Sequence, residues 1–187
     1  MKRIPTSPNG QMAFLKIARM GHPVLRRVAD PVADPTDPDI RRLAQDMIET
    51  MIDAPGIGLA APQIHVPLRL IVFRVPAARS TGQPDDGPLP DTVVVNPVVE
   101  PVGDERTMRW EGCLSIPGLR GEVPRWNRII YRGWDLDGRP VERMASGTHA
   151  GVVQHEVDHL DGVLYIDRMP DLKRLAFNEE MRHFVQD

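Results

Sequence analysis

Several features that would place the chain in a special class are missing from its sequence. A single cysteine, Cys113, excludes an internal disulfide and favours a reducing compartment. No apolar run approaches the roughly 18 residues of a membrane helix, and the basic start has no apolar segment typical of a secretory signal. The net charge of -3 offers no electrostatic attraction for nucleic acid or an anionic membrane. We therefore expect a cytoplasmic protein that contacts neither.

What is present suits one globular domain. The 187 residues, 41% of them apolar and 26% charged, are enough for a single sizeable core. We expect one domain over residues 1–187, in which residues 1–11 form a flexible leader. Nineteen prolines favour frequent chain reversals and short elements over a helix bundle.

Helical patterns occur at three places. The first helix begins with Asp37 as N-cap and Pro38 at the first helical position, and Pro55-Gly56 ends it. A second helix begins near Ser146 or Thr148 and runs to about Leu160. A final helix is predicted from about Leu172 to Phe184.

Strand-like segments separate the first two helices. They cover residues 68–75, 92–100 and 122–134, and the last continues into a hairpin at D-L-D-G. The composition of residues 76–91 predicts a surface loop. This order of elements predicts an α+β fold with a mainly antiparallel sheet.

The stretch V-V-Q-H-E-V-D-H-L-D-G, residues 152–162, carries a metal-binding pattern. On a helix His155 and His159 share one face, and Glu156 follows the first histidine. Cys113, in W-E-G-C-L-S at an expected strand end, is the best third ligand. One thiolate and two imidazoles would leave a tetrahedral ion one open position, as in catalytic sites.

Simpler explanations stay open at this point. The helix pattern could arise by chance, and a lone cysteine is more often a small buried hydrophobe. A closed structural zinc site would need a fourth protein ligand, for which His149 is the nearby choice.

The stretch A-P-G-I-G-L-A-A-P-Q, residues 54–63, follows the first helix. Small residues let a substrate approach the backbone closely, and glycine at 56 or 58 permits conformations closed to other residues. A helix end followed by a turn explains Pro55-Gly56 but leaves A-A-P-Q unexplained.

Together G-I-G-L-A-A-P-Q, E-G-C-L-S and Q-H-E-V-D-H resemble the three motifs of the peptide deformylases, in order and spacing from about Phe14 to Met169. The resemblance implies antiparallel sheets around a central helix that carries H-E-x-x-H. It implies a metal-dependent hydrolase that removes the formyl group from the formyl-methionine of new polypeptides. It further implies Fe²⁺ in the cell, with Zn²⁺, Ni²⁺ or Co²⁺ as substitutes, and a monomer that meets nascent chains near the ribosome.

The resemblance also implies residue roles. The ion would be held by Cys113, His155 and His159, with water as the fourth ligand. Glu156 would act as general base and then general acid. The side-chain amide of Gln63 and the backbone N–H of Leu114 would stabilise the oxyanion. Substrate contacts are expected from Gly56, Ile57, Gly58, Gly112, Arg120, Gly151 and Val152.

Two positions depart from the family pattern, because many relatives carry bulkier side chains where this chain has Thr148 and Gly151. The simpler interpretation is drift compensated by neighbours such as Trp110. The alternative is a widened or reshaped methionine pocket. We also predict an ion pair between Asp158 and Arg125, with a role in stability alone.

Three other functions remain. A zinc peptidase would need a metal ligand downstream of the helix. A binding or structural metal module would need neither Glu156 nor Gln63. A hydrolase of another small N-acyl group would keep every motif.

Overall fold

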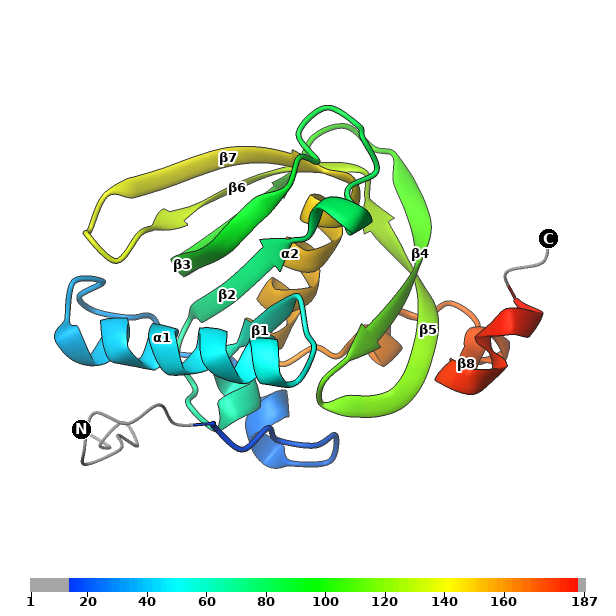
Figure 1. Cartoon of the computed structure of the whole chain (residues 1–187), viewed down its shortest axis with the longest axis horizontal. Helices are drawn as coiled ribbons and strands as arrows, with labels where there is room; N and C mark the ends of the chain where they lie inside the picture. Colours follow the sequence, from blue (N-terminus) through cyan, green and yellow to red (C-terminus); the bar gives the residue numbers. More distant parts are fainter. Residues whose placement is uncertain (1–13, 185–187) are drawn as a thin grey trace.

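The computed structural model describes residues 14–184, so the expected leader over residues 1–11 lies outside the described part of the chain. Within this range the fold consists of eight strands in two sheets, two α-helices and several short 3-10 turns (Figure 1). The predicted α+β fold is confirmed. No helix among these residues is long and apolar enough to cross a membrane.

Helix α1, Pro38–Asp53, forms as its sequence predicts. The Asp37 carboxylate accepts a hydrogen bond from the Asp39 backbone N–H at 2.8 Å, and Pro38 occupies the first turn. Ala54 ends the helix before Pro55. Its apolar stripe is buried and comprises Ile40, Leu43, Ala44, Met47 and Met51.

The larger sheet has five antiparallel strands in the order β1-β2-β3-β6-β7. Their bounds are Gly58–Ala60, Leu70–Val75, Leu89–Pro101, Arg128–Trp134 and Pro140–Ser146. The predicted strands at 68–75 and 92–100 and the hairpin at D-L-D-G are confirmed. In β2, Leu70 and Val72 belong to the core under α1, whereas Ile71 and Phe73 belong to the core under α2. The two helices therefore cover opposite faces of this sheet.

The smaller sheet consists of β4 (Arg106–Cys113), β5 (Ile116–Trp126) and β8 (Leu175–Phe177), with β5 in the middle. The prediction of one continuous strand over residues 122–134 is wrong. The chain leaves the smaller sheet after Trp126 and enters the larger one at Arg128. The Gln154 side-chain amide accepts a hydrogen bond from the Trp126 backbone N–H and donates one to the Trp126 carbonyl, each at 3.0 Å. It thus takes the place of a strand partner.

The predicted helix from Leu172 to Phe184 is also wrong. Two 3-10 turns, Leu172–Arg174 and Asn178–His183, flank β8, which pairs with residues 119–121 of β5. Because β5 has an edge that needs a partner, pairing with it competes with the local helical preference and prevails.

Helix α2, Gly147–Leu160, lies between the two sheets (Figure 1) and is buried around nearly its whole circumference. The fully buried Asp86 accepts a hydrogen bond from the His149 backbone N–H at 2.8 Å, near the start of the helix. The segment 76–91 is largely exposed as predicted, but it also supplies this interior cap. Composition did not indicate that role.

Candidate metal site and active-site pocket

The three predicted ligands come together between α2 and the end of β4. Cys113 is the last residue of β4, while His155 and His159 lie one turn apart on α2. The Cys113 Sγ atom is 3.3 Å from His159 Nε2, and one donor atom from each of the three residues lies within 4.8 Å of the others. The chain folds so that residues 42 positions apart share one site.

This donor set fits a metal ion. One sulfur and two imidazole nitrogens are the ligands of zinc and of other borderline divalent ions. Among the described residues no fourth histidine, cysteine or carboxylate belongs to this group. His149 is engaged elsewhere, with Nε2 3.1 Å from the Tyr131 hydroxyl and Nδ1 3.2 Å from the Asp85 carbonyl. The geometry therefore does not support a closed site completed by His149.

A carboxylate that sequence analysis missed orients the first histidine. The Oε2 atom of Glu111 lies 2.7 Å from His155 Nδ1, which leaves Nε2 of the ring for the metal. Arg125 donates two hydrogen bonds to Glu111, at 2.6 and 2.8 Å. Burial alone would raise the pKa of Glu111, but the bonds from Arg125 and His155 outweigh it and lower the pKa to about 2. Glu111 is thus held ionised.

The predicted ion pair is confirmed, since Arg125 Nη1 lies 2.6 Å from Asp158 Oδ2. Arg125 is only 3% exposed, and it connects Asp158 to Glu111 and through it to His155. The pair is therefore linked to one of the candidate ligand histidines. The alternation of side chains along β4 could have revealed Glu111, because it lies two residues before Cys113 and so on the same face.

Glu156 faces the edge strand of the larger sheet. A Cβ atom at Gly58 would lie 2.2 Å from Glu156 Oε1 and 2.8 Å from a methyl group of Val152, so no side chain fits there. Burial raises the pKa of Glu156 to about 7, so its carboxyl group can hold or release a proton near neutrality. The glycine at 58 is required by the space that Glu156 occupies.

The tetrapeptide A-A-P-Q orients a side-chain amide toward the same site. The Oε1 atom of Gln63 accepts a hydrogen bond from the Ala60 backbone N–H at 2.8 Å. This bond directs Nε2 toward Cys113 Sγ, at 3.5 Å, and Ser115 Oγ, at 3.2 Å. Gln63 is 1% exposed and lies in a 3-10 turn that follows β1. The amide is therefore a fixed donor beside the Cys113 sulfur.

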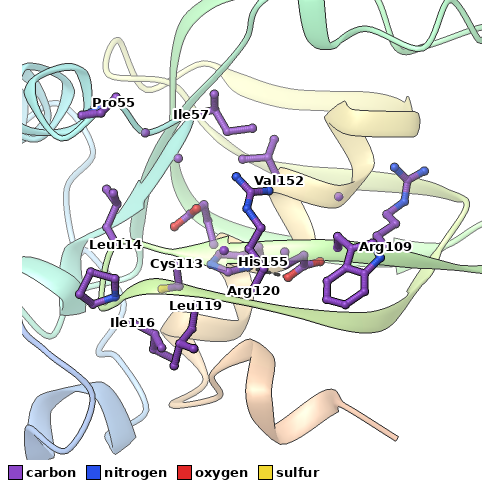
Figure 2. A pocket seen from close by; sticks show the side chains of 18 of the residues that line it. Pro55, Ile57, Arg109, Cys113, Leu114, Ile116, Leu119, Arg120, Val152 and His155 are labelled. Atoms are coloured by element: carbon purple, nitrogen blue, oxygen red, sulfur yellow. Dashed lines mark hydrogen bonds and ion pairs between the residues drawn. The ribbon is translucent and has the colours of Figure 1, made fainter. Parts of the chain in front are cut away.

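A pocket of about 850 Å³ opens over these groups (Figure 2). This is within the usual size range of small-ligand sites. Gln63, Leu114 and Glu156 line it together with Cys113 and His155, whereas His159 lies beneath. Every residue predicted to contact substrate also lines it: Gly56, Ile57, Gly58, Gly112, Arg120, Gly151 and Val152.

Sequence analysis missed several polar residues of the pocket wall. Asn178 accepts a hydrogen bond from Arg120 Nε at 3.2 Å, and Arg79 and Arg109 line the pocket near the start of α2. The atom nearest to a Cβ at Gly151 would be Arg109 Cδ, at 3.7 Å. Trp110, the neighbour expected to compensate for this glycine, lines the same pocket, and its ring centre lies 5.2 Å from that of Phe184.

Comparison with known proteins gives consistent matches over most of the chain. Residues 14–175 match the family model of polypeptide deformylase. The chain is 51% identical to peptide deformylase 1 of Bordetella pertussis, over 87% of this chain and 92% of that protein. It is 48% identical to peptide deformylase 2 of Ralstonia nicotianae, over 87% and 91%. A Met-Ala-Ser-bound class I type b peptide deformylase from Acinetobacter baumannii superposes with a TM-score of 0.76 at 34% identity, over 85% of this chain and all (100%) of that one.

Proposed function

Because the chain belongs to the peptide deformylase family, whose members remove the formyl group from new polypeptides, we propose that Cys113, His155 and His159 hold the metal ion of this reaction. The protein is a metal-dependent hydrolase that acts on the N-formyl amide. The observation that carries the assignment is that these three donors, Glu156 and Gln63 meet at one pocket.

The proposed ion is ferrous iron in the cell, and Zn²⁺, Ni²⁺ or Co²⁺ can replace it. When bound, the ion would polarise the formyl oxygen and lower the pKa of a coordinated water toward neutrality. The divalent-metal affinity order favours zinc over iron at sulfur and nitrogen donors, so supply in the cell must select iron.

Glu156 is proposed as the group that moves protons. Its carboxylate would accept the proton of the attacking water and then donate it to the amine as the C–N bond breaks, releasing formate and a free N-terminus. A carboxyl group with a pKa of about 7 is suited to both steps near neutral pH. Gly58 supports this role, because it leaves the carboxylate room at the pocket wall.

Gln63 and Leu114 are proposed as donors to the oxygen that becomes negatively charged during attack. The Gln63 amide is directed into the site by its bond to the Ala60 backbone, so little reorganisation is needed. Leu114 follows Cys113 directly and lines the pocket, which supports this role for its backbone N–H.

The peptide is proposed to bind in extended form along β1. This strand lies at the edge of the larger sheet, and the pocket is lined by its first residue, Gly58, and by Gly56 and Ile57 just before it. Backbone pairing of this kind reads length and direction more than side chains, as suits an enzyme with many nascent substrates. The first side chain would enter between Val152 and the helix face near His155.

The remaining proposals concern the setting. We infer that the protein acts as a single-domain monomer in the cytoplasm, where new polypeptides emerge near the ribosome. The net charge of -3 gives no electrostatic attraction for nucleic acid, so direct nucleic-acid binding is not part of the proposal.

Formate release from formyl-Met-Ala-Ser, with acetyl-Met-Ala-Ser as the matched control, tests the function. Metal-free protein is reconstituted without oxygen with Fe²⁺, Zn²⁺, Ni²⁺ or Co²⁺. We expect the iron form to hydrolyse the formyl peptide rapidly and to lose this activity in air. The nickel and cobalt forms should keep their activity, and the zinc form should turn over slowly. Faster cleavage of the acetyl peptide would favour a hydrolase of another N-acyl group. Metal binding and full activity in Cys113→Ser would contradict the ligand assignment.

A further inference from the structure

Strand β4 and helix α2 meet in three successive contacts. At the metal end Cys113 Sγ lies 3.3 Å from His159, and one step further Glu111 lies 2.7 Å from His155. At the third step the stem of Arg109 lies 3.7 Å from the position of a Cβ on Gly151. Each step advances two residues along the strand, about 6.7 Å, and four along the helix, about 6 Å.

Arg109 therefore lies one step beyond His155, on the side away from Cys113 (Figure 2). A substrate with its formyl group at the metal ligands would place its first side chain along this same direction, between Ile57, Val152 and the β4 strand. The spacing of one step is comparable to the reach of a methionine side chain with its three rotatable bonds. The end of that side chain would approach Arg109.

This end of the pocket is rich in donors. Arg79, Arg109, Thr148 and Gly151 line it, and the Thr148 hydroxyl already donates to the Arg79 carbonyl at 2.6 Å. The Arg109 guanidinium makes no hydrogen bond or ion pair with any described residue, and its Nε atom is buried without a partner. The nearest acids are engaged elsewhere, Asp86 with His149 and Glu111 with Arg125.

We propose that Arg109 is a specificity-determining residue that lets this enzyme deformylate peptides whose first side chain ends in a hydrogen-bond acceptor, with N-formyl-methionine sulfoxide accepted beside N-formyl-methionine. This inference rests on the proposed function. Gly151 makes it possible, because a large side chain there would occupy the space of the Arg109 stem.

The chemistry favours this substrate for a specific reason. Oxidation turns the apolar thioether into a polar sulfoxide whose oxygen accepts hydrogen bonds. An apolar pocket would leave that oxygen buried and unpaired, which strongly disfavours binding. Here the sulfoxide oxygen would accept a hydrogen bond from the half-buried guanidinium of Arg109, whose Nε atom has no other partner. The reaction at the formyl group is unchanged, because Arg109 contacts the side chain and not the reacting atoms.

The test compares kcat/KM for formyl-Met-Ala-Ser, formyl-norleucine-Ala-Ser and each epimer of the methionine-sulfoxide peptide, using nickel-loaded protein. The variants are Arg109→Leu, Arg109→Lys and Gly151→Leu, the last of which should displace the Arg109 stem. Arg106→Leu is the matched control, because Arg106 lies on the same strand but stacks over the Trp126 ring at 3.8 Å, outside the pocket. Ratios between substrates cancel differences in metal content and folded fraction.

For the wild type we expect the better sulfoxide epimer within about tenfold of the methionine peptide. Arg109→Leu should lower the sulfoxide-to-methionine ratio by about tenfold or more, mainly through KM, and leave the norleucine-to-methionine ratio unchanged. Gly151→Leu should act in the same direction, Arg109→Lys should retain part of the ratio, and Arg106→Leu should retain all of it.

The test separates failure of the role of Arg109 from failure of the proposed function. If formyl-Met-Ala-Ser is hydrolysed but the sulfoxide ratio is the same in wild type and Arg109→Leu, the role of Arg109 is wrong and the proposed function stands. If no metal-loaded form releases formate from formyl-Met-Ala-Ser, the proposed function itself is wrong, and the inference with it.

Discussion

Helices α1 and α2 cover opposite faces of one sheet, yet they are held by different forces. Helix α1 buries one apolar stripe and exposes its other side to solvent. Helix α2 is buried almost all round, although many of its residues are polar. An amphipathic surface helix needs only burial of its stripe, whereas polar groups in the interior each need a partner.

The partners of α2 come from several distant segments. Four of its buried polar side chains have such partners: Gln154 bonds the backbone of Trp126, His149 the Tyr131 hydroxyl, His155 the Glu111 carboxylate and Asp158 the Arg125 guanidinium. Helix α2 is therefore specified by complementary polar contacts in addition to its apolar residues, and helix α1 mainly by apolar area. Substitutions on α2 should be costly even where they remove little volume, while the exposed side of α1 should tolerate change.

The largest expected effect is that of Glu156→Gln on α2. The variant should fold and bind metal but lose about a thousandfold or more in kcat, because no group then moves the proton of the attacking water. Formate release per bound metal measures it. Asp53→Asn, the same chemical change on the exposed side of α1, should leave activity unchanged. Activity of metal-loaded Glu156→Gln within tenfold of wild type would contradict the proposed role.

Arg125→Leu should rank next. Removing Arg125 leaves the buried carboxylate of Glu111 without its cation, which costs roughly 3–5 kcal/mol in the free energy of unfolding; Asp158 keeps its ion pair with Arg168. Metal affinity should also fall, by about 10–100-fold, because Glu111 no longer holds His155 as firmly. Urea unfolding and competition with a chelator measure the two effects. Arg41 forms an exposed ion pair with Asp137, so the control Arg41→Leu should cost under about 1 kcal/mol of unfolding free energy. If both variants lose the same stability, the buried pair of α2 is worth no more than the exposed pair of α1.

Met47→Ala tests the apolar side of α1. Met47 is fully buried, so truncation should cost about 2–5 kcal/mol of unfolding free energy through lost burial and a cavity. Activity per folded, metal-loaded molecule should remain near wild type, since the residue is on the far side of the sheet from α2. Ile52→Ala, at 43% exposure, is the control and should cost far less. A selective loss of kcat in Met47→Ala would link the two cores more closely than expected.

The smallest effect is expected at the start of α1. Asp37→Ala removes the N-cap bond to Asp39 and should cost about 1 kcal/mol of stability, measured by thermal or urea unfolding. Asp37→Asn keeps a capping oxygen and should recover most of the loss. If both variants lose the same amount, the charge of Asp37 and not its hydrogen bond stabilises the helix.

Some features of the molecule could be predicted without a structure. The stripe and caps of α1, the extent of α2 and the shared face of its two candidate ligand histidines depend on residues within a few turns of each other. Cys113 as the third donor and the Asp158–Arg125 ion pair were also predicted. The sequence motifs predict these features, because metal ligation and helical periodicity restrict residue type and spacing directly.

The sequence by itself therefore determined the ligand types, the ligand helix and the reaction class that they resemble. Only the tertiary structure decided that Glu111 orients His155, that β8 replaces the predicted C-terminal helix, and that Arg109 lies over Gly151. These features depend on which strand edge is free and on the register of β4 against α2. Segments far apart in the chain set both. A local pattern can place Glu111 on the same face of β4 as Cys113, but it cannot show which side chain of α2 it contacts.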